Sequence, residues 1–443
     1  MMLLRLYGWL TWLAQPLLRR KLARRARAEP GYGQAVPERF GHYVQPPSSG
    51  WVWVHAVSLG ETRAAAVLVA ALRERLPGLR LLLTHGTATG RAEGARLLRE
   101  GDLQVWQPWD TPGATGRFLA HFRPAVGILM ETEIWPWLIE SSRRAGVPLV
   151  LANARLSEKS LRGARRVPLL PPAYAALTAA YAQTEADAAR LRAAGAPVAG
   201  VFGNLKFDAA PDAAQLARGR QWRAAAGRPV VLFASSREGE EAALAALLAA
   251  DRRLLGELQW LIVPRHPQRF DEVAALVVQA QGIAVARRSA WGEGGPPAPQ
   301  GAVWLGDSLG EMALYYGLAD VALLGGSFEP LGGQNLIEAA ACGCPVLMGP
   351  HTFNFAEAAA LAGQAGAALR VADLAAAVQQ AERLAADPAA RTRAAQAGLD
   401  FAAAHRGAAQ RTAEAIAVLA LRAAAAGLRP TGHSGQGSGR SAF

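Results

Sequence analysis

The 443-residue sequence contains few cysteines, few acidic residues and no long uninterrupted apolar run. Its two cysteines, Cys342 and Cys344, lie in the segment AACGCPVL, where a bridge between them would close no useful loop. We therefore expect both to be small core residues in a reducing compartment. Because no His or Cys pair elsewhere has ligand spacing, no metal site is expected.

The shortage of acidic residues gives the chain a strong positive charge. Lys and Arg number 47 against 35 Asp and Glu, a formal net charge of +12, which favours an anionic partner. The sequence has no zinc-finger spacing, no RNA-recognition aromatic motif and no basic run interleaved with aromatics, so a nucleic acid is not expected. A membrane surface fits the composition better.

The N-terminal segment, residues 1–30, has the features of a membrane-associating element. An apolar stretch interrupted by Arg5 and Pro16 precedes six basic residues. These six are Arg19, Arg20, Lys21, Arg24, Arg25 and Arg27. The charge follows the apolar stretch, which disfavours a cleaved signal peptide, and the stretch is marginal for a true span. We favour an anchor that lies at the interface or barely spans the bilayer, while a helix packed on the protein body stays an alternative.

From Trp51 onward, short apolar runs alternate with helical patterns, which predicts βαβ units and parallel sheets. Six predicted strands lie in WVWVHAV, LRLLLTHG, LQVWQPW, AVGILME, VPLVLANA and TAAYAQT. Six more follow in RPVVLFASS, LQWLIVPRH, GIAVARR, AVWLGD, VALLGGS and CPVLMGP. Because the strand-and-helix pattern begins again after Gly227, we predict an α/β protein with two doubly wound, Rossmann-like domains, residues 31–203 and 229–423. Residues 204–228 form the predicted hinge and a helix, and residues 424–443 a disordered Gly/Ser tail.

Ligands of open parallel sheets bind beyond the carboxyl ends of the strands, so the loops that follow strands are the candidate sites. Glu61 follows the first strand and a Ser-Leu-Gly turn, where its carboxylate would serve the helix dipole or accept a proton from a substrate hydroxyl. Glu131 and Glu133 follow the strand AVGIL. We interpret Glu131 as functional and Glu133 as structural, because buried acids need partners or a role.

Basic residues follow the next strand and the predicted hinge. The segment LANARLSEKS and the Arg-rich RGARR predict a basic lobe that either grips phosphates or is a solvated face. Lys206, between Leu205 and Phe207 at the predicted domain junction, is interpreted as functional.

The second predicted domain carries several loops suited to a nucleotide. Ser235 and Ser236 resemble a helix cap with free N–H donors, and Arg265 is held between two prolines. A Gly turn at Gly310 and a Gly-rich loop before Asn335 each precede a helix, and Glu338 would take the hydroxyls of a ribose.

Three nucleotide motifs are absent. There is no G-x-G-x-x-G after the first strand, no G-x-x-x-x-G-K-[ST], and no D-x-D pair of the metal-binding type. These absences count against a dinucleotide-dependent dehydrogenase, an NTPase and a metal-held diphosphate. A nucleotide donor opposite a carboxylate base is the outline of a glycosyltransferase.

Seven segments, in this order, resemble the motifs of the bacterial 3-deoxy-D-manno-octulosonic acid (Kdo) transferases. They are HAVSLGETRAA, METEIWPWLI, LANARLS, NLKFD, VPRHPQRF, GDSLGEM and GGQNLIEAAACGCPVLMGPHTFNF. The resemblance implies a GT-B glycosyltransferase, with two Rossmann-like domains facing a central cleft. It implies transfer of Kdo from CMP-Kdo to the lipid A precursor (lipid IVA) at the cytoplasmic side of the inner membrane, without a cofactor or metal.

The resemblance also implies residue roles. Glu61 would be the general base, and Glu131 and Lys206 would stabilise the transition state, with inversion at the anomeric carbon. The first domain would bind the acceptor and the second the nucleotide sugar. The CMP contacts would be Pro264, Arg265, Gly310, Glu311, Met312, Asn335, Leu336, Ile337 and Glu338. The alternatives are a GT-B transferase that uses a UDP-sugar and a nucleotide-sensing membrane scaffold without turnover.

Overall fold

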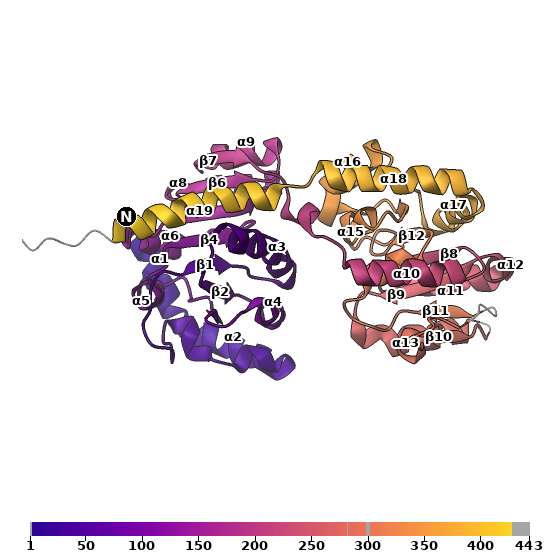
Figure 1. Ribbon diagram of the computed structural model, residues 1–443. Helices are drawn as coiled ribbons and strands as arrows, with labels where there is room; N and C mark the ends of the chain where they lie inside the picture. Colours follow the sequence, from indigo (N-terminus) through magenta and orange to yellow (C-terminus); the bar gives the residue numbers. More distant parts are fainter. Residues whose placement is uncertain (1, 281, 298–301, 428–443) are drawn as a thin grey trace, which may run out of the picture. The chain divides into compact units, whose positions relative to one another are not determined.

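A computed structural model describes residues 2–280, 282–297 and 302–427. Its residues divide into two compact units (Figure 1). The first contains the described residues up to Asp208 and those from Gly407 onward, and the second runs from Ala209 to Arg406. The predicted tail lies outside the described residues except for its first four, which belong to a helix.

The first unit is built on a seven-stranded parallel sheet of order β3-β2-β1-β4-β5-β6-β7. Its strands are β1 (Val52–His55), β2 (Leu81–His85), β3 (Leu103–Trp106), β4 (Val126–Met130), β5 (Leu149–Ala154), β6 (Ala179–Ala182) and β7 (Val198–Val201). The central strands are buried along their whole length, as expected of a parallel sheet covered on both faces.

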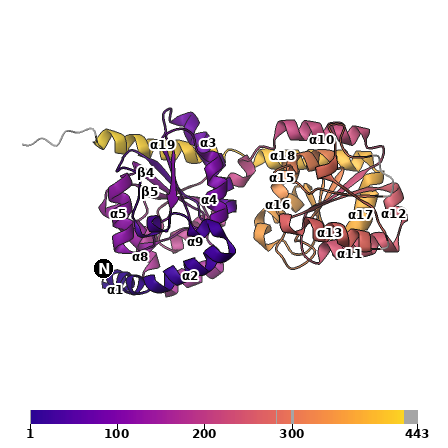
Figure 2. The same cartoon turned by 90° about the horizontal axis from the view of Figure 1, so that it is seen from below.

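Helices cover both faces of this sheet. The unit contains α1 (Met2–Leu13), α2 (Gln15–Ala28), α3 (Leu59–Arg75), α4 (Ala88–Gly94), α5 (Pro112–Phe122), α6 (Pro136–Arg144), α7 (Glu158–Arg166), α8 (Leu170–Ala175), α9 (Glu185–Ala193) and α19 (Ala408–Gly427). Short 3-10 turns are η1 (Pro30–Gly33), η2 (Val36–Phe40), η3 (Ala95–Leu97) and η4 (Leu205–Asp208). One core cluster joins the sheet to α5 through α9, and a second joins the other face to α3 and α19. The helices α1 and α2 lie away from α19 (Figure 2).

The second unit repeats the design with strand order β10-β11-β9-β8-β12-β13-β14, again all parallel. Its strands are β8 (Val230–Ser236), β9 (Gln259–Pro264), β10 (Val285–Arg287), β11 (Val303–Leu305), β12 (Val321–Leu324), β13 (Val346–Met348) and β14 (Ala368–Arg370). Cys342 and Cys344 are buried and unbridged, which confirms the expectation that they are core residues.

The helices of this unit are α10 (Ala213–Ala225), α11 (Glu240–Ala250), α12 (Arg253–Glu257), α13 (Phe270–Gln279), α14 (Met312–Leu318), α15 (Leu336–Ala341), α16 (Ala356–Gln364), α17 (Leu374–Ala386) and α18 (Pro388–Ala404). Its 3-10 turns are η5 (Pro267–Arg269), η6 (Arg288–Ala290) and η7 (Phe353–Phe355). Gly219 lets α10 pack directly on α14, since a Cβ there would lie 2.1 Å from the Leu314 carbonyl oxygen.

The structure departs from the predicted organisation at three places. All twelve predicted strands are present, but the edge strands β7 and β14 were missed. The helix α19 belongs to the first unit, whereas the sequence grouped residues up to 423 with the second domain. Its apolar face, including Ala413 and Ile416, packs in the cluster that contains α3.

The N-terminal segment folds as two helices, not as one continuous stretch. No helix in the described ranges is both long and apolar enough to cross a bilayer. The apolar side chains of α1 and of the start of α2 are nevertheless exposed. They include Leu6, Trp9, Leu10, Trp12, Leu13 and Leu17, each more than half exposed.

Candidate functional site

Glu61 lies in the first turn of α3, directly beyond the carboxyl end of β1. The Ser58 hydroxyl accepts a hydrogen bond from the Glu61 backbone N–H, and the Glu61 carboxylate accepts from the Val57 backbone N–H at 2.7 Å. Ser58 Oγ also lies 3.3 Å from Glu61 Oε1. These hydrogen bonds, one from the Ser58 cap and one from the residue before it, fix the carboxylate at the end of the strand, as the position of Glu61 after the turn predicted.

The surroundings of Glu61 raise the pKa of its carboxyl group above the value in water. Burial, together with the nearby carboxylates of Glu133 and Glu131, raises its pKa to about 7, against the lowering effect of the hydrogen bonds from the Val57 N–H and Ser58. A carboxylate with this pKa is ionised in a substantial fraction of molecules at neutral pH. It is also basic enough to receive a proton in a reaction, which is the balance that suits a general base.

Glu131 and Lys206 come together, although the sequence separates them widely. Lys206 Nζ lies 3.6 Å from Glu131 Oε1, and Arg155 Nε lies 3.1 Å from Glu131 Oε2. The Glu131 side chain is almost fully buried, whereas half of the Arg155 side chain and about a quarter of that of Lys206 are exposed. One buried carboxylate therefore holds two cations that face outward.

Two unusual backbone conformations build this cluster. Glu131 and Asn153 have φ values of 54° and 51°, in the left-handed region that non-glycine residues rarely adopt. The Asn153 side-chain oxygen accepts the Leu205 backbone N–H at 3.0 Å, which fixes the turn η4 that carries Lys206. Its amide nitrogen is buried without a hydrogen-bond partner in the described part of the chain. The motif LANAR contains the signal for Asn153 and Arg155, but it was interpreted only as part of a basic lobe.

Glu133 is held by neighbouring side chains, and its carboxylate raises the pKa of Glu61. Its Oε2 accepts the Trp135 indole N–H at 2.7 Å and lies 3.9 Å from His55 Nε2. Burial lowers the pKa of His55 to about 3, so the imidazole is neutral and supplies no counter-charge. Burial also raises the pKa of Glu133.

The residues expected to bind CMP all lie in the second unit, at the carboxyl ends of β9, β11 and β12. Pro264 ends β9, Gly310 has a φ of 80° in the loop after β11, and Asn335 caps α15. Arg265 Nε donates to Gln334 Oε1 at 3.2 Å, which links the end of β9 to the loop before α15. The all-parallel topology thus brings all four expected nucleotide loops, after β8, β9, β11 and β12, to the same edge of the sheet.

The residues expected to bind CMP differ in their burial and in their hydrogen-bond partners. Glu311 is engaged by Arg288 at 2.9 Å and by the Ser308 hydroxyl, and it precedes Met312, the first residue of α14. Leu336 and Ile337 are buried core residues, and the Ile337 backbone N–H donates to the Asn335 side chain at 3.2 Å. Glu338 lies in the first turn of α15.

The expectation that Ser235 and Ser236 cap the following helix is wrong. Gly239 is the N-cap of α11, and no side chain caps it. The Ser236 hydroxyl donates to Glu241 at 2.9 Å, and Ser235 adopts a φ of 56°. The acids Glu240 and Glu241 in the first turn of α11 are buried; Glu240 accepts loop N–H groups and Glu241 pairs with Arg269.

Comparison with known proteins decides the family. A family described as 3-Deoxy-D-manno-octulosonic-acid transferase (kdotransferase) matches residues 34–209. A 3-deoxy-D-manno-octulosonic acid transferase from Bordetella pertussis is 52% identical over 90% of this chain and 96% of its own length. The chain belongs to the Kdo transferase family. A second member, from Haemophilus influenzae, is 33% identical over 91% of this chain and 96% of its own.

Solved structures confirm the fold of this family member. A glycosyltransferase from Rickettsia africae matches with a TM-score of 0.55 at 12% identity, over 84% of this chain and 99% of its own. MurG from Acinetobacter baumannii matches with a TM-score of 0.50 at 14% identity, over 84% and 99%. The predicted GT-B architecture, with two Rossmann-like units, is therefore confirmed.

Proposed function

We propose that this Kdo transferase moves Kdo from CMP-Kdo to a lipid A precursor, lipid IVA, with inversion at the anomeric carbon. The observation that carries the proposal is Glu61, a fixed carboxylate with a pKa of about 7 at a strand end, in a chain of this family. The described surroundings of Glu61 include the Glu131 cluster, which perturbs its pKa.

The reaction needs one proton transfer and one substitution. Glu61 takes the proton of the acceptor hydroxyl, and the oxygen forms a bond to the anomeric carbon of Kdo as the bond from that carbon to the CMP phosphate oxygen breaks. CMP leaves with the bonding electron pair. Because the nucleophile attacks from the face opposite the leaving group, the anomeric centre inverts.

The cations of the site have a defined role in this scheme. Kdo is itself a carboxylate, and CMP departs as an anion, so negative charge accumulates near the reacting carbon. Lys206 and Arg155, both fixed by Glu131, offer oriented positive charge, which stabilises a transition state better than mobile solvent. The CMP moiety is assigned to the loops that carry Pro264, Arg265, Gly310–Met312 and Asn335–Glu338.

We further propose that the enzyme works on the cytoplasmic surface of the inner membrane. The exposed apolar side chains of α1, with Trp9 and Trp12 among them, would enter the interface. The basic residues of α2 would attract anionic lipid headgroups.

The test is transfer by the purified full-length chain in detergent, with fresh CMP-Kdo and lipid IVA, followed by mass spectrometry of the lipid. We expect a mass increase of one or more Kdo units, inhibited by added CMP and not by UDP. Inhibition by UDP alone would instead indicate a UDP-sugar donor. CMP binding without any product would indicate a nucleotide-sensing scaffold.

A further inference from the structure

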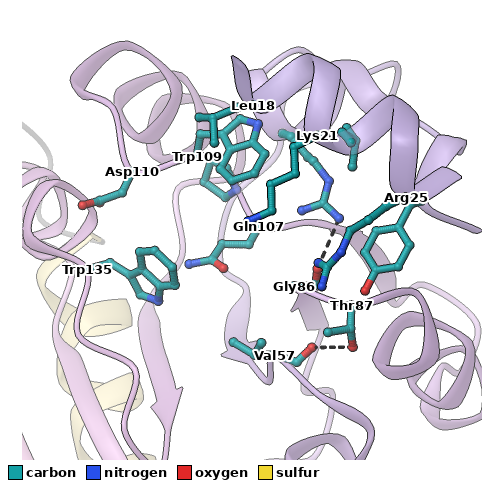
Figure 3. A pocket seen from close by; sticks show the side chains of 14 residues that line it. Leu18, Lys21, Arg25, Val57, Gly86, Thr87, Gln107, Trp109, Asp110 and Trp135 are labelled. Atoms are coloured by element: carbon teal, nitrogen blue, oxygen red, sulfur yellow. Dashed lines mark hydrogen bonds between the residues drawn. The ribbon is translucent and has the colours of Figure 1, made fainter. Parts of the chain in front are cut away.

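A pocket of about 250 Å³ in the first unit lies between α2 and the loops that follow β1, β2 and β3. Three cations line it: Lys21 and Arg25 of α2, and Arg39 of η2. Figure 3 shows Lys21 and Arg25 on the helix at one side of the pocket and Val57 and Thr87 at the other. The cations thus come from two elements and converge on one hollow.

Two buried donors in this lining have no partner in the described residues. They are Arg39 Nε and the indole Trp109 Nε1. Arg39 is only 5% exposed, and its single side-chain hydrogen bond runs from one terminal nitrogen to the Gly86 carbonyl at 3.3 Å. Buried polar groups are usually paired, so the wall of this pocket contains two polar groups whose burial no protein acceptor offsets.

Arg39 stacks on Trp106, with its guanidinium carbon 3.9 Å from the ring centroid, but it has no ion-pair partner among the described residues. The neighbouring Glu38 is engaged elsewhere, by Arg91 at 3.0 Å and by the Trp106 backbone N–H at 2.8 Å. Burial lowers the pKa of Arg39 to about 10, which still leaves the guanidinium charged at neutral pH. No carboxylate in the described chain lies within ion-pair distance of Arg39, Lys21 or Arg25.

One acidic residue, Asp110, lines the pocket, but its carboxylate is already hydrogen-bonded to backbone N–H groups. Its oxygens accept the backbone N–H groups of Leu138 at 2.8 Å and Trp137 at 3.2 Å, at the start of α6. Its carboxylate points away from the centre of the pocket in Figure 3. The positive charge of the pocket therefore stays available for an anion.

The pocket adjoins the general base. Val57 lines the pocket and donates its backbone N–H to Glu61, so a ligand in the pocket lies one residue from the catalytic turn. Leu18 and Leu22 add an apolar side to the lining, on the helix that follows the exposed apolar face of α1. An amphiphile with an anionic headgroup would match a cationic pocket that lies next to exposed apolar side chains.

We propose that this pocket binds a phosphate-class anionic group of the glycolipid acceptor and thereby places the acceptor hydroxyl at Glu61. The inference rests on the proposed transferase function. Guanidinium and ammonium groups with additional N–H donors are the groups by which proteins recognise phosphate. Lys21, Arg25 and Arg39 are then specificity-determining residues for the acceptor and not for CMP-Kdo.

The test compares two double variants of the full-length enzyme in neutral detergent without phospholipid. Lys21→Gln with Arg25→Gln removes the two rim cations, and Arg24→Gln with Arg27→Gln removes equal charge from the same helix outside the pocket. All four side chains are exposed, so both variants should fold. We expect the pocket variant to raise the KM for lipid IVA at least tenfold above the control pair, with the KM for CMP-Kdo equal in both.

A dephosphorylated acceptor supplies the second arm. The wild type should show a raised KM for lipid IVA that lacks one phosphate, and the pocket variant should no longer distinguish the two acceptors. Equal KM values in the two double variants would overturn the inference while wild-type transfer still upheld the function. An effect present only with anionic phospholipid vesicles would also overturn it, because the anion would then belong to the bilayer. Absence of transfer by the wild type would remove the proposed function itself.

Discussion

Glu61 illustrates how a single side chain can be both anchored and destabilised. The Val57 N–H and Ser58 hydroxyl hold its carboxylate in place, yet burial and two nearby carboxylates oppose its ionisation. The net result is a pKa of about 7 instead of 4.5. Functional sites often contain such opposed contributions, because a poised proton acceptor is rarely the most stable choice for the fold.

Replacing Glu61 by Gln should therefore stabilise the protein at high pH. Since the folded-state pKa is raised above the unfolded value, the stability linked to the protonated carboxyl is complete below about 4.5 and is lost as the pH rises through about 7. Gln keeps the neutral form at every pH. We expect the variant to exceed the wild type by about 1 kcal/mol at pH 8.5 and by much less at pH 5.5, a figure reduced for the partial exposure of the site. Urea unfolding of both proteins at both pH values measures this difference. A wild type that is more stable than the variant at pH 8.5 would contradict the prediction.

Glu131 and Lys206 should act as one unit. We expect Lys206→Met and Glu131→Gln each to lower kcat by about a hundredfold, because each disrupts the same oriented charge. The double variant should lose little more than either single variant, since residues that act together are not additive. Steady-state kinetics of the four proteins tests the coupling. Multiplicative losses would show that the two side chains act independently.

At this scale the sequence allowed the position of Glu61 to be predicted, but not the partners of Glu131. The turn after the first strand fixes Glu61 locally, through Ser58. The pairing of Glu131 with Arg155 and Lys206 depends on β5 lying beside β4 and on Asn153 holding Leu205, which are tertiary contacts. Such contacts leave no periodic signal in the sequence.

At the scale of elements, Asp208 links the two places where the chain passes between the units. It ends the turn η4, which carries Lys206, and its carboxylate accepts the backbone N–H groups of Gly407 and of Ala409, the latter at 2.6 Å. Asp208 therefore caps α19. The same contact fastens the turn that presents Lys206.

Asp208→Ala should consequently affect both stability and catalysis. We expect a loss of about 1 kcal/mol of unfolding free energy, the usual cost of removing a cap. We also expect kcat to fall by about fivefold or more, because Lys206 would be less well placed. A rise of about 1 kcal/mol in the activation free energy corresponds to that factor. The control is Asp212→Ala, which removes the cap of α10 in the second unit, where Asp212 accepts from Gln215. Equal kcat losses in both variants would show that capping alone, and not the position of Lys206, is responsible.

The elements themselves were largely predictable because the parallel strands are continuous apolar runs. The missed strands, β7 and β14, are edge strands with partly exposed residues and sequences VAGV and ALR, so they lack that pattern. The placement of α19 was missed for a different reason. An Ala-rich amphipathic helix fits any apolar face, and nothing local in its sequence specifies that it packs beside α3.

At the scale of the whole molecule, the net charge of +12 and the exposed apolar face of α1 are consistent with work at an anionic membrane surface. Trp9 and Trp12, 65% and 57% exposed, stack edge to face at 6.0 Å on this face. Aromatic side chains of this kind favour the headgroup region of a bilayer.

Trp9→Ser with Trp12→Ser should weaken binding to vesicles that contain anionic phospholipid by about tenfold or more, because two large apolar side chains no longer enter the interface. The control is Val278→Ser with Leu421→Ser, at two exposed apolar positions outside α1. Vesicle co-sedimentation of both variants and the wild type measures the effect. Equal binding by all three proteins would contradict a membrane role for α1.

The central claim is that Glu61 is the base that removes the acceptor proton during Kdo transfer. The most direct measurement is the single-turnover rate of transfer from CMP-Kdo to lipid IVA between pH 5 and 9, for the wild type and Glu61→Gln. The wild-type rate should rise with pH and level off above an apparent pKa of about 7, because only the ionised carboxylate accepts a proton. The variant should be slower by about a hundredfold or more at its plateau and should lack this titration. A variant that keeps the wild-type rate and the same pH profile would remove Glu61 from the mechanism.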